Sequence, residues 1–139
     1  LRKALMEDDS AVIESFLDGT EISVGCYRVK GETKVLPATE VVSHNEFFDY
    51  DAKYNGQVEE ITPARIADET ARIYELLGCN GIIRIDYILT KEPDGTDKIN
   101  LIEVNTTPGM TPTSFIPQQV RAAGMEMKDV LSDIVENQF

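Results

Sequence analysis

Two segments of the chain carry polar side chains at a spacing that could hold a divalent cation. Arg84 and Asp86 alternate along one predicted strand, and Glu103 and Asn105 alternate along the next. Side chains two residues apart on a strand lie on the same face of the sheet. If the two strands pair symmetrically about Asp94–Gly95, Asp86 lies opposite Glu103 and Arg84 lies opposite Asn105. The sequence therefore predicts one polar face that carries two carboxylates, an amide and a guanidinium.

This combination of side chains favours the binding of a cation together with an anion. Two carboxylates that face each other across a sheet repel by up to ~1 kcal/mol, and a buried pair either shares a proton or binds a cation. Carboxylate and amide oxygens suit Mg²⁺ or Mn²⁺ rather than zinc, and Arg84 beside them can hold an anion that the metal also contacts. These are the parts of a phosphoryl-transfer site. The alternative is a solvated polar face, which is what most acidic residues on strands form.

The opposite face of the same hairpin is predicted to be apolar. The pairing described above places Ile85 and Tyr87 against Val104 and Ile102. A register that produces one polar and one apolar face is consistent with a half-buried sheet. A bulge would shift the pairing by one residue and turn the side chains beyond it to the other face.

Hydrophobic patterning and turn residues predict an α+β fold with a mainly antiparallel sheet and flanking helices, in a single domain covering residues 1–139. The predicted strands are Ala11–Leu17, Glu21–Lys30, Lys34–Ser43, Gly81–Thr90 and Lys98–Asn105. The first three form an antiparallel meander, and the last two form the hairpin. The predicted helices are the end of one over Leu1–Glu7, then Thr62–Gly78, Ser114–Ala123 and Met127–Glu136, with a loop over Asn45–Gln57.

Composition excludes several classes of partner. The net charge of −12, from 13 basic and 25 acidic residues, argues against nucleic acid and anionic membranes. No apolar run approaches the ~20 residues that span a bilayer. Cys26 and Cys79 lie in apolar surroundings and are interpreted as reduced core thiols of a cytoplasmic protein. The helical pattern at Leu1, without a start methionine, predicts a fragment of a longer protein.

Several motifs together resemble the C-terminal part of D-alanine–D-alanine ligase, an ATP-grasp enzyme. They are Arg84–Asp86, then Glu103–Thr111 (EVNTTPGMT), and then Ser114. Weaker similarity runs through Asp49–Tyr54 and Ile13–Leu17, so the resemblance covers nearly the whole chain. It implies the C-terminal portion of an ATP-grasp domain, with ATP as co-substrate.

The resemblance also implies a role for each residue of the polar face. Asp86 and Glu103 would bind one Mg²⁺ (or Mn²⁺) ion, and Glu103 with Asn105 would bind a second. The two ions would hold the β- and γ-phosphates of ATP. Arg84 would stabilise the transferred phosphoryl group and the acyl phosphate formed on the first D-alanine.

Two residues of the following loop would contact the reacting substrates. The main-chain amide of Gly109 would help to hold the oxyanion formed when the second D-alanine attacks; composition alone favours an ordinary turn there. Ser114 stands where the loop meets a helix, and as an N-cap it would point its hydroxyl and free N–H groups outward. By resemblance it binds the carboxylate of the second D-alanine; otherwise it is a cap that only stabilises the helix.

The resemblance assigns the nucleotide base to the segment at the start of the chain. Glu14 and the backbone of Ser15, Phe16 and Leu17 would contact adenine, and Glu21 would accept the ribose hydroxyls. Without the resemblance, acidic residues on a strand are most often simply exposed to solvent.

Residues 49–57 resemble the mobile loop that closes over the reaction in this family. Lys53 would contact the phosphates, and Tyr54 would help to close the loop over the second substrate. Tyrosine there accompanies ligases that make the dipeptide, whereas phenylalanine accompanies those that use D-lactate. We therefore expect D-alanine as the second substrate. The alternative is a surface loop whose aromatic residues pack back onto the domain.

The chain departs from the family by lacking its N-terminal substrate domain and the first part of its ATP-grasp region. We expect the complete protein to be a homodimeric, cytoplasmic ligase that makes D-alanyl-D-alanine for peptidoglycan precursors, and residues 1–139 alone to have negligible activity. A D-alanine–D-lactate or other carboxylate–amine ligase is one alternative. A non-catalytic nucleotide-binding module is another.

Overall fold

The computed structural model describes residues 1–41 and 61–139. The strands are β1 (Thr20–Val29), β2 (Glu32–Val35), β3 (Thr39–Val41), β4 (Ile82–Lys91) and β5 (Asp97–Asn105). The helices are α1 (Ile61–Leu76), α2 (Phe115–Ala122) and α3 (Met127–Glu136), together with a short 3₁₀ helix, η1 (Ala4–Met6). All strand pairs are antiparallel, in the order β2–β1–β4–β5, and β3 also pairs with β1. The predicted α+β class is confirmed.

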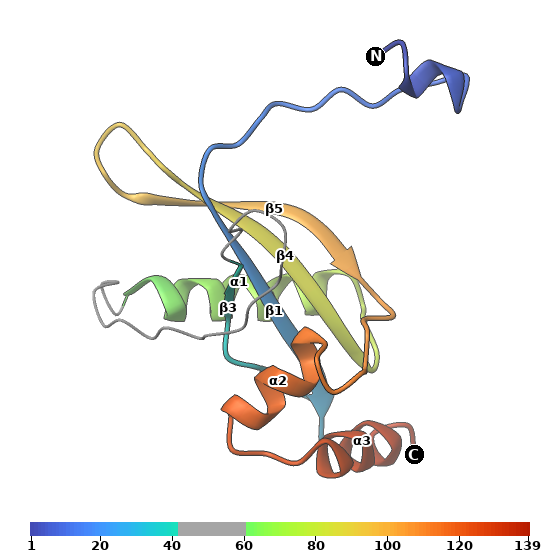
Figure 1. Cartoon of the computed structure of the whole chain (residues 1–139). Helices are drawn as coiled ribbons and strands as arrows, with labels where there is room; N and C mark the ends of the chain where they lie inside the picture. Colours follow the sequence, from blue (N-terminus) through green and yellow to red (C-terminus); the bar gives the residue numbers. More distant parts are fainter. Residues whose placement is uncertain (42–60) are drawn as a thin grey trace.

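Helices cover both faces of the central strands (Figure 1). Alternate residues of β1, such as Val24 and Cys26, pack with Tyr74 of α1 on one face. Tyr27 belongs to the other face and packs with Val120 of α2 and Val130 of α3. Because side chains alternate along a strand, β1 is buried on both sides, and it forms the centre of the fold. Cys26 and Cys79 are both free thiols; Cys26 is buried in the α1-side core, whereas Cys79 is only partly buried and packs against it.

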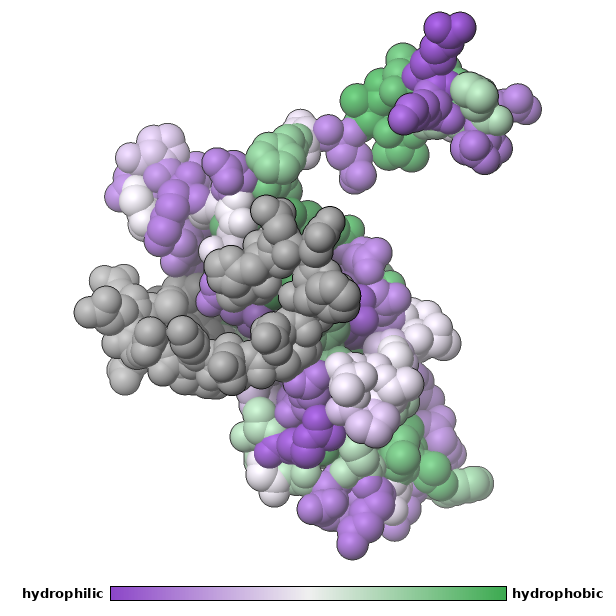
Figure 2. Space-filling view, viewed as in Figure 1, coloured by the Kyte–Doolittle hydropathy of each residue, from purple (hydrophilic) through white to green (hydrophobic). Residues whose placement is uncertain are grey.

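The start of the chain differs from the prediction. Residues 11–18 form no strand, and only Ala4–Met6 are helical, as a single 3₁₀ turn. The segment runs away from the sheet (Figure 1) and exposes apolar side chains (Figure 2), among them Val12 and Phe16. The β-branched residues here predicted a strand, but strand propensity depends strongly on tertiary context, and residues 11–18 pair with none of the described strands.

The predicted strand Lys34–Ser43 is two strands in the structure. Pro37 separates β2 from β3, and both pair with the same side of β1. Proline has no N–H to donate to a strand ladder, so the ladder is interrupted at this residue. The predicted three-strand meander is therefore wrong in its first strand and in the continuity of its last.

The remaining elements agree closely with the sequence. The hairpin and the last two helices lie where predicted, and α1 begins at Ile61 and ends at Leu76, just before Gly78 in a left-handed conformation. The predicted loop Asn45–Gln57 lies outside the described residues. Within the described parts of the chain, the helices are too short or too polar to cross a bilayer.

The side chain of Gln119 completes the strand ladder beside Pro37. Its Oε1 accepts a hydrogen bond from the Gly25 N–H at 2.9 Å, and its Nε2 donates to the Ser23 carbonyl at 2.9 Å and to Thr39 Oγ1 at 3.1 Å. A peptide group of a neighbouring strand would offer β1 the same acceptor and donor. Because Gln119 is only 1% exposed, these bonds satisfy backbone groups that water does not reach.

Gly25 allows α2 to come this close to β1. A Cβ atom at residue 25 would lie 2.4 Å from Ile116 Cδ1 and 2.8 Å from Gln119 Oε1. A side chain at residue 25 would therefore displace these buried side chains and the hydrogen bond to Gln119. Close packing of α2 side chains against β1, rather than a left-handed φ angle, explains glycine at this position.

We predict that Gln119→Leu lowers the free energy of unfolding by about 2–4 kcal/mol, because it leaves the Gly25 N–H and the Ser23 carbonyl buried without partners. Equilibrium denaturation in urea measures the change. Gln118→Leu is the matched control: its amide donates to the Thr113 carbonyl at the exposed surface, and its loss is expected to stay within about 0.5 kcal/mol. Equal losses in the two variants would contradict the ladder role of Gln119.

Candidate metal and phosphate site

The register of the β4–β5 hairpin confirms the predicted polar face. Asp86 lies opposite Glu103, and Arg84 lies opposite Asn105. The predicted symmetry about residues 94 and 95 is wrong, however, because Lys91 pairs with Asp97 and the loop is centred on residue 94. A bulge between the loop and the site adds one residue to β5, so the two departures cancel at the polar face.

The bulge corrects one prediction for the apolar face. Tyr87 pairs with Leu101 instead of Ile102, and Ile102 is 49% exposed. Val104, on the site side of the bulge, still packs against the α1-side core. The extra residue turns Ile102 out of the alternation that the sequence pattern assumed.

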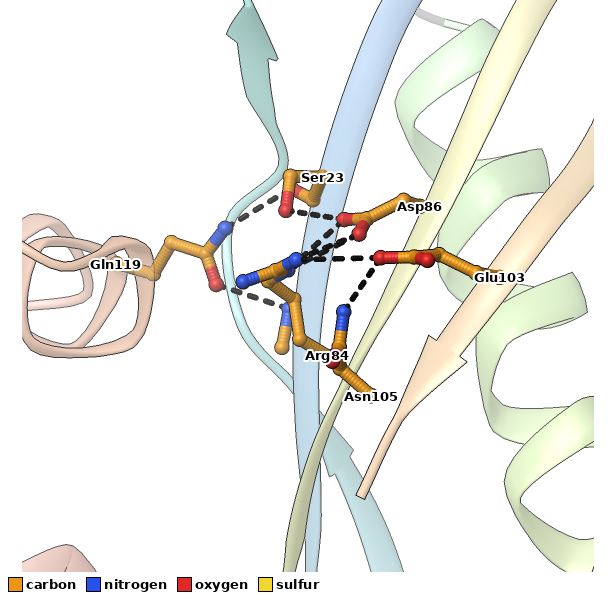
Figure 3. A network of polar contacts seen from close by, with 7 residues as sticks. Ser23, Arg84, Asp86, Glu103, Asn105 and Gln119 are labelled. Atoms are coloured by element: carbon orange, nitrogen blue, oxygen red, sulfur yellow. Dashed lines mark hydrogen bonds and ion pairs between the residues drawn. The ribbon is translucent and has the colours of Figure 1, made fainter. Parts of the chain in front are cut away.

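The polar side chains form one connected network (Figure 3). Ser23 Oγ donates to Asp86 Oδ1 at 2.7 Å. Arg84 donates from Nε to Asp86 Oδ1 at 3.0 Å and from Nη2 to Asp86 Oδ2 at 2.8 Å, and its Nη2 lies 3.6 Å from Glu103 Oε1. Asn105 Nδ2 donates to Glu103 Oε1 at 2.6 Å. The guanidinium therefore lies between the two carboxylates.

Ion pairing and hydrogen bonds favour the ionised form of Asp86 in spite of its burial. The residue is only 8% exposed, so it does not belong to a solvated polar face. Burial by itself raises the pKa of its carboxyl, but hydrogen bonds from Arg84 and Ser23 outweigh burial, and the net pKa is lowered. The same hydrogen bond with Asp86 raises the pKa of Arg84 against the effect of burial. The Glu103 side chain, in contrast, is 59% exposed.

The donor set of this face fits a hard divalent cation. It offers two carboxylates and one amide oxygen, all from adjacent antiparallel strands, and such oxygens are the ligands that Mg²⁺ and Mn²⁺ prefer. Across residues 1–41 and 61–139, no cluster of three or more acidic, histidine or cysteine side chains competes with it. Both oxygens of Asp86 already accept hydrogen bonds from Arg84, so a cation there requires the guanidinium to move.

The loop before α2 brings Gly109 and Ser114 together. A Cβ atom at residue 109 would lie 2.9 Å from Ser114 Oγ. Ser114 is the N-cap residue of α2, as predicted, but its hydroxyl makes no capping bond to the helix. It pairs with Thr111 Oγ1 at 2.7 Å and accepts from the Thr111 N–H at 3.2 Å. The expected outward-pointing cap is therefore corrected to a hydroxyl turned back into the loop.

Three residues of the network were not predicted from the sequence. Ser23 and Gln119 support Asp86 and β1, and Phe115 places its ring 5.3 Å from the Arg84 guanidinium. Alternation along β1 puts Ser23 on the face of Glu21, which was a weak signal that could have found it. Phe115 and Gln119 come from α2, and nothing local in the sequence pairs that helix with β4.

The predicted nucleotide residues are not all brought to this face. Glu21 begins the polar alternation of β1 and contributes to the raised pKa of Arg84. Glu14, Ser15, Phe16 and Leu17 belong to the segment that leaves the sheet, and the structure does not place them beside the carboxylates.

Two further predicted site residues, Lys53 for the phosphates and Tyr54 for the second substrate, lie outside the described residues.

Comparisons with known proteins show the family to which the chain belongs. The family model for the C-terminus of D-ala D-ala ligase matches residues 1–136. A D-alanine–D-alanine ligase of Bacteroides fragilis is 60% identical over 147 aligned positions, which cover 100% of this chain and 44% of the relative.

Solved structures show the same fold. D-alanyl-alanine synthetase A from Vibrio cholerae has a TM-score of 0.72 at 27% identity, covering 89% of this chain and 39% of its own. D-alanine–D-alanine ligase from Bacillus anthracis complexed with ATP has a TM-score of 0.65 at 26% identity, covering 88% and 38%.

The antiparallel sheet and its flanking helices are the C-terminal portion of an ATP-grasp fold, shared with these ligases. The chain belongs to the family of D-alanine–D-alanine ligase C-terminal regions. It spans less than half the length of the Bacteroides fragilis relative that it matches.

The ionised state of Asp86 predicts a pH-dependent stability difference. Asp86→Asn is expected to lower the free energy of unfolding at pH 7 by about 2 kcal/mol, the contribution of hydrogen bonds to a charged group. The folded pKa lies below the unfolded value of about 3.9, so ionisation favours the folded state. This stabilisation is complete above that value and is lost as the pH falls below it. The difference in free energy of unfolding between the unsubstituted protein and Asp86→Asn, measured by denaturation, should be smaller at pH 3 than at pH 7. An equal difference at the two pH values would contradict the prediction.

Proposed function

We propose that this chain is the C-terminal part of an ATP-dependent D-alanine–D-alanine ligase. The observation that carries the proposal is the polar face of the hairpin, where Arg84, Asp86, Glu103 and Asn105 meet. Family membership supports the assignment, as does the high identity to a curated ligase of Bacteroides fragilis. The reaction joins two D-alanines through an acyl phosphate at the expense of ATP, for peptidoglycan precursors in the cytoplasm.

Asp86, Glu103 and Asn105 would hold the magnesium or manganese ions, with Glu103 shared between two of them. Bound there, the ions neutralise the charge of the ATP phosphates during transfer. The two carboxylates already lie opposite each other, so the protein is arranged for the cations before they bind. Their mutual repulsion, which the guanidinium offsets in this structure, becomes part of the attraction for metal.

Arg84 would exchange partners when the phosphates bind. Its guanidinium hydrogen bonds to Asp86 and stacks on Phe115, and it is only partly exposed. A phosphoryl group offers it a second set of anionic oxygens in the geometry that guanidinium prefers. We propose that Arg84 turns from Asp86 to the transferred phosphoryl group, which frees carboxylate oxygens for the cations.

Gly109 and Ser114 would act on the substrates. The absence of a side chain at Gly109 leaves its amide open to the oxyanion formed when the second amine attacks, and any Cβ atom there would displace the Ser114 hydroxyl. The Ser114 hydroxyl is held by Thr111 beside the start of α2. It would receive the carboxylate of the second D-alanine.

The remaining assignments concern nucleotide and substrate choice. Glu21 lies on the polar side of β1, which supports a contact with the ribose. Glu14 with the residues 15–17 would contact adenine once the extended segment packs against the rest of a complete enzyme. Lys53 would contact the phosphates, and Tyr54 favours D-alanine over D-lactate as the second substrate. The complete enzyme would be a homodimer with no nucleic-acid or membrane partner.

Carboxylate chemistry at Glu103 gives the most direct mutational test. Glu103→Gln keeps the size of the side chain but removes the charge shared between the cations. It is measured in a hybrid enzyme whose C-terminal part, residues 1–139, replaces the matching part of the Bacteroides fragilis ligase. We expect kcat to fall by at least about 10²-fold with unchanged circular dichroism. Glu92→Gln, which removes a charge near the hairpin loop, should retain activity; comparable activity in both variants would argue against the metal site.

Phosphate release tests the choice of second substrate, and it also tests whether residues 1–139 need the rest of the enzyme for activity. The hybrid enzyme should release phosphate from ATP with D-alanine alone faster than with D-alanine plus D-lactate. Residues 1–139 by themselves should release almost none, because they match only 44% of the relative's length. Equal or faster turnover with D-lactate would contradict the choice of second substrate. Nucleotide binding without turnover in the hybrid would favour a non-catalytic module.

A further inference from the structure

Ser23 is a buried hydroxyl that contacts the carboxylate face from the neighbouring strand. It lies on β1 directly opposite Asp86 of β4 and is 1% exposed. Its Oγ donates a 2.7 Å hydrogen bond to Asp86 Oδ1 (Figure 3). A bond to an ionised acceptor is shorter and stronger than one between neutral groups. Ser23 therefore restrains one oxygen of Asp86 from inside the sheet.

Arg84 binds both oxygens of the Asp86 carboxylate. Ser23 differs from Arg84 in two respects: it carries no charge, and burial fixes its position. If Arg84 turns to the phosphoryl group, as the proposed function requires, Ser23 still holds Oδ1. Oδ2 is then left for a cation, in an orientation that the sheet determines.

The backbone of Ser23 is itself fixed from the opposite side. Gln119 of α2 accepts from the Gly25 N–H and donates to the Ser23 carbonyl. It also donates to Thr39 Oγ1, so its amide is bonded on both sides. The chain of contacts runs from α2 through β1 to β4 without a solvent-exposed member, since Gln119, Ser23 and Asp86 are all buried.

We infer that Ser23 is a positioning residue that orients the Asp86 carboxylate for a divalent cation, and that Gln119 fixes the backbone from which Ser23 acts. This inference rests on the proposed function. Outer hydrogen-bond partners of metal-binding side chains set the orientation of the ligand, and removing them commonly weakens metal binding by about 10- to 100-fold. Loss of the Ser23 hydroxyl would leave Asp86 free to rotate once Arg84 departs.

The experiment measures Mn²⁺ binding to the hybrid enzyme in the presence of a non-hydrolysable ATP analogue. The electron paramagnetic resonance signal of Mn²⁺ broadens on binding to protein and so reports the bound fraction. Ser23→Ala is expected to weaken Mn²⁺ binding by about 10-fold or more. Ser23→Thr retains the hydroxyl and should bind Mn²⁺ like the unsubstituted hybrid.

Thr70→Val is the matched control for the loss of a buried hydroxyl. Thr70 is fully buried on the α1 side of the sheet, where its hydroxyl bonds with Tyr87 Oη at 2.8 Å. Its replacement removes a similar hydrogen bond without touching Asp86, so the stability measured in urea should fall while Mn²⁺ binding stays unchanged. Weakening confined to Ser23→Ala supports the positioning role.

Two other results overturn the inference. The first is unchanged Mn²⁺ binding in Ser23→Ala. The second is equal weakening of Mn²⁺ binding in Ser23→Ala and Thr70→Val, because the weakening would then follow from lower stability of the fold and not from the orientation of Asp86. In both cases the proposed function survives. Failure of the unsubstituted hybrid to bind Mn²⁺ with the nucleotide analogue would instead remove the metal site, and with it both the proposed function and the role of Ser23.

Discussion

The Arg84 guanidinium holds two carboxylates together on one face of the sheet, and the other parts of the site are arranged around this contact. Asp86 is buried and hydrogen-bonded to the guanidinium, whereas Glu103 is exposed and lies farther from it. Without a cation between them, neighbouring carboxylates would repel and one would take up a proton. Hydrogen bonds from Arg84 and Ser23 lower the pKa of Asp86 in spite of its burial. The face therefore carries a cation of the protein's own beside its two carboxylates.

The two layers of helices give the sheet two different faces. On one side, α1 covers an apolar core that includes Ile85 and Tyr87 of β4. On the other, α2 and α3 cover only part of the sheet, and the first residue of α2, Phe115, borders the arginine. The polar network therefore lies at the boundary between packed core and solvent. Such a position keeps Asp86 in a restricted orientation while leaving Glu103 accessible to a ligand.

The family assignment and the geometry support each other at different levels. The match over residues 1–136 and the shared fold establish what the chain is related to. They do not by themselves place any side chain. The register of β4 and β5 does, because it brings two carboxylates, an amide and an arginine to one face. The ligase reaction is proposed from both, since this chain matches less than half of the Bacteroides fragilis enzyme.

The sequence alone determined the local parts of this protein: the hairpin, the three helices and the pairing of Asp86 with Glu103. Alternation and turn residues specify these, because they depend on neighbours close in the chain. The predicted pairing of Asp86 with Glu103 is right, but the assumed symmetry about residues 94 and 95 is not. The loop is centred on residue 94, and the bulge in β5 restores the predicted register at the polar face. The first predicted strand failed because strand propensity depends on tertiary context, and residues 11–18 pair with none of the described strands. Only tertiary structure decided that Gln119 fills the gap at Pro37 and that Ser23 reaches Asp86. These contacts join residues far apart in the chain, through close approach of backbones that no local pattern records.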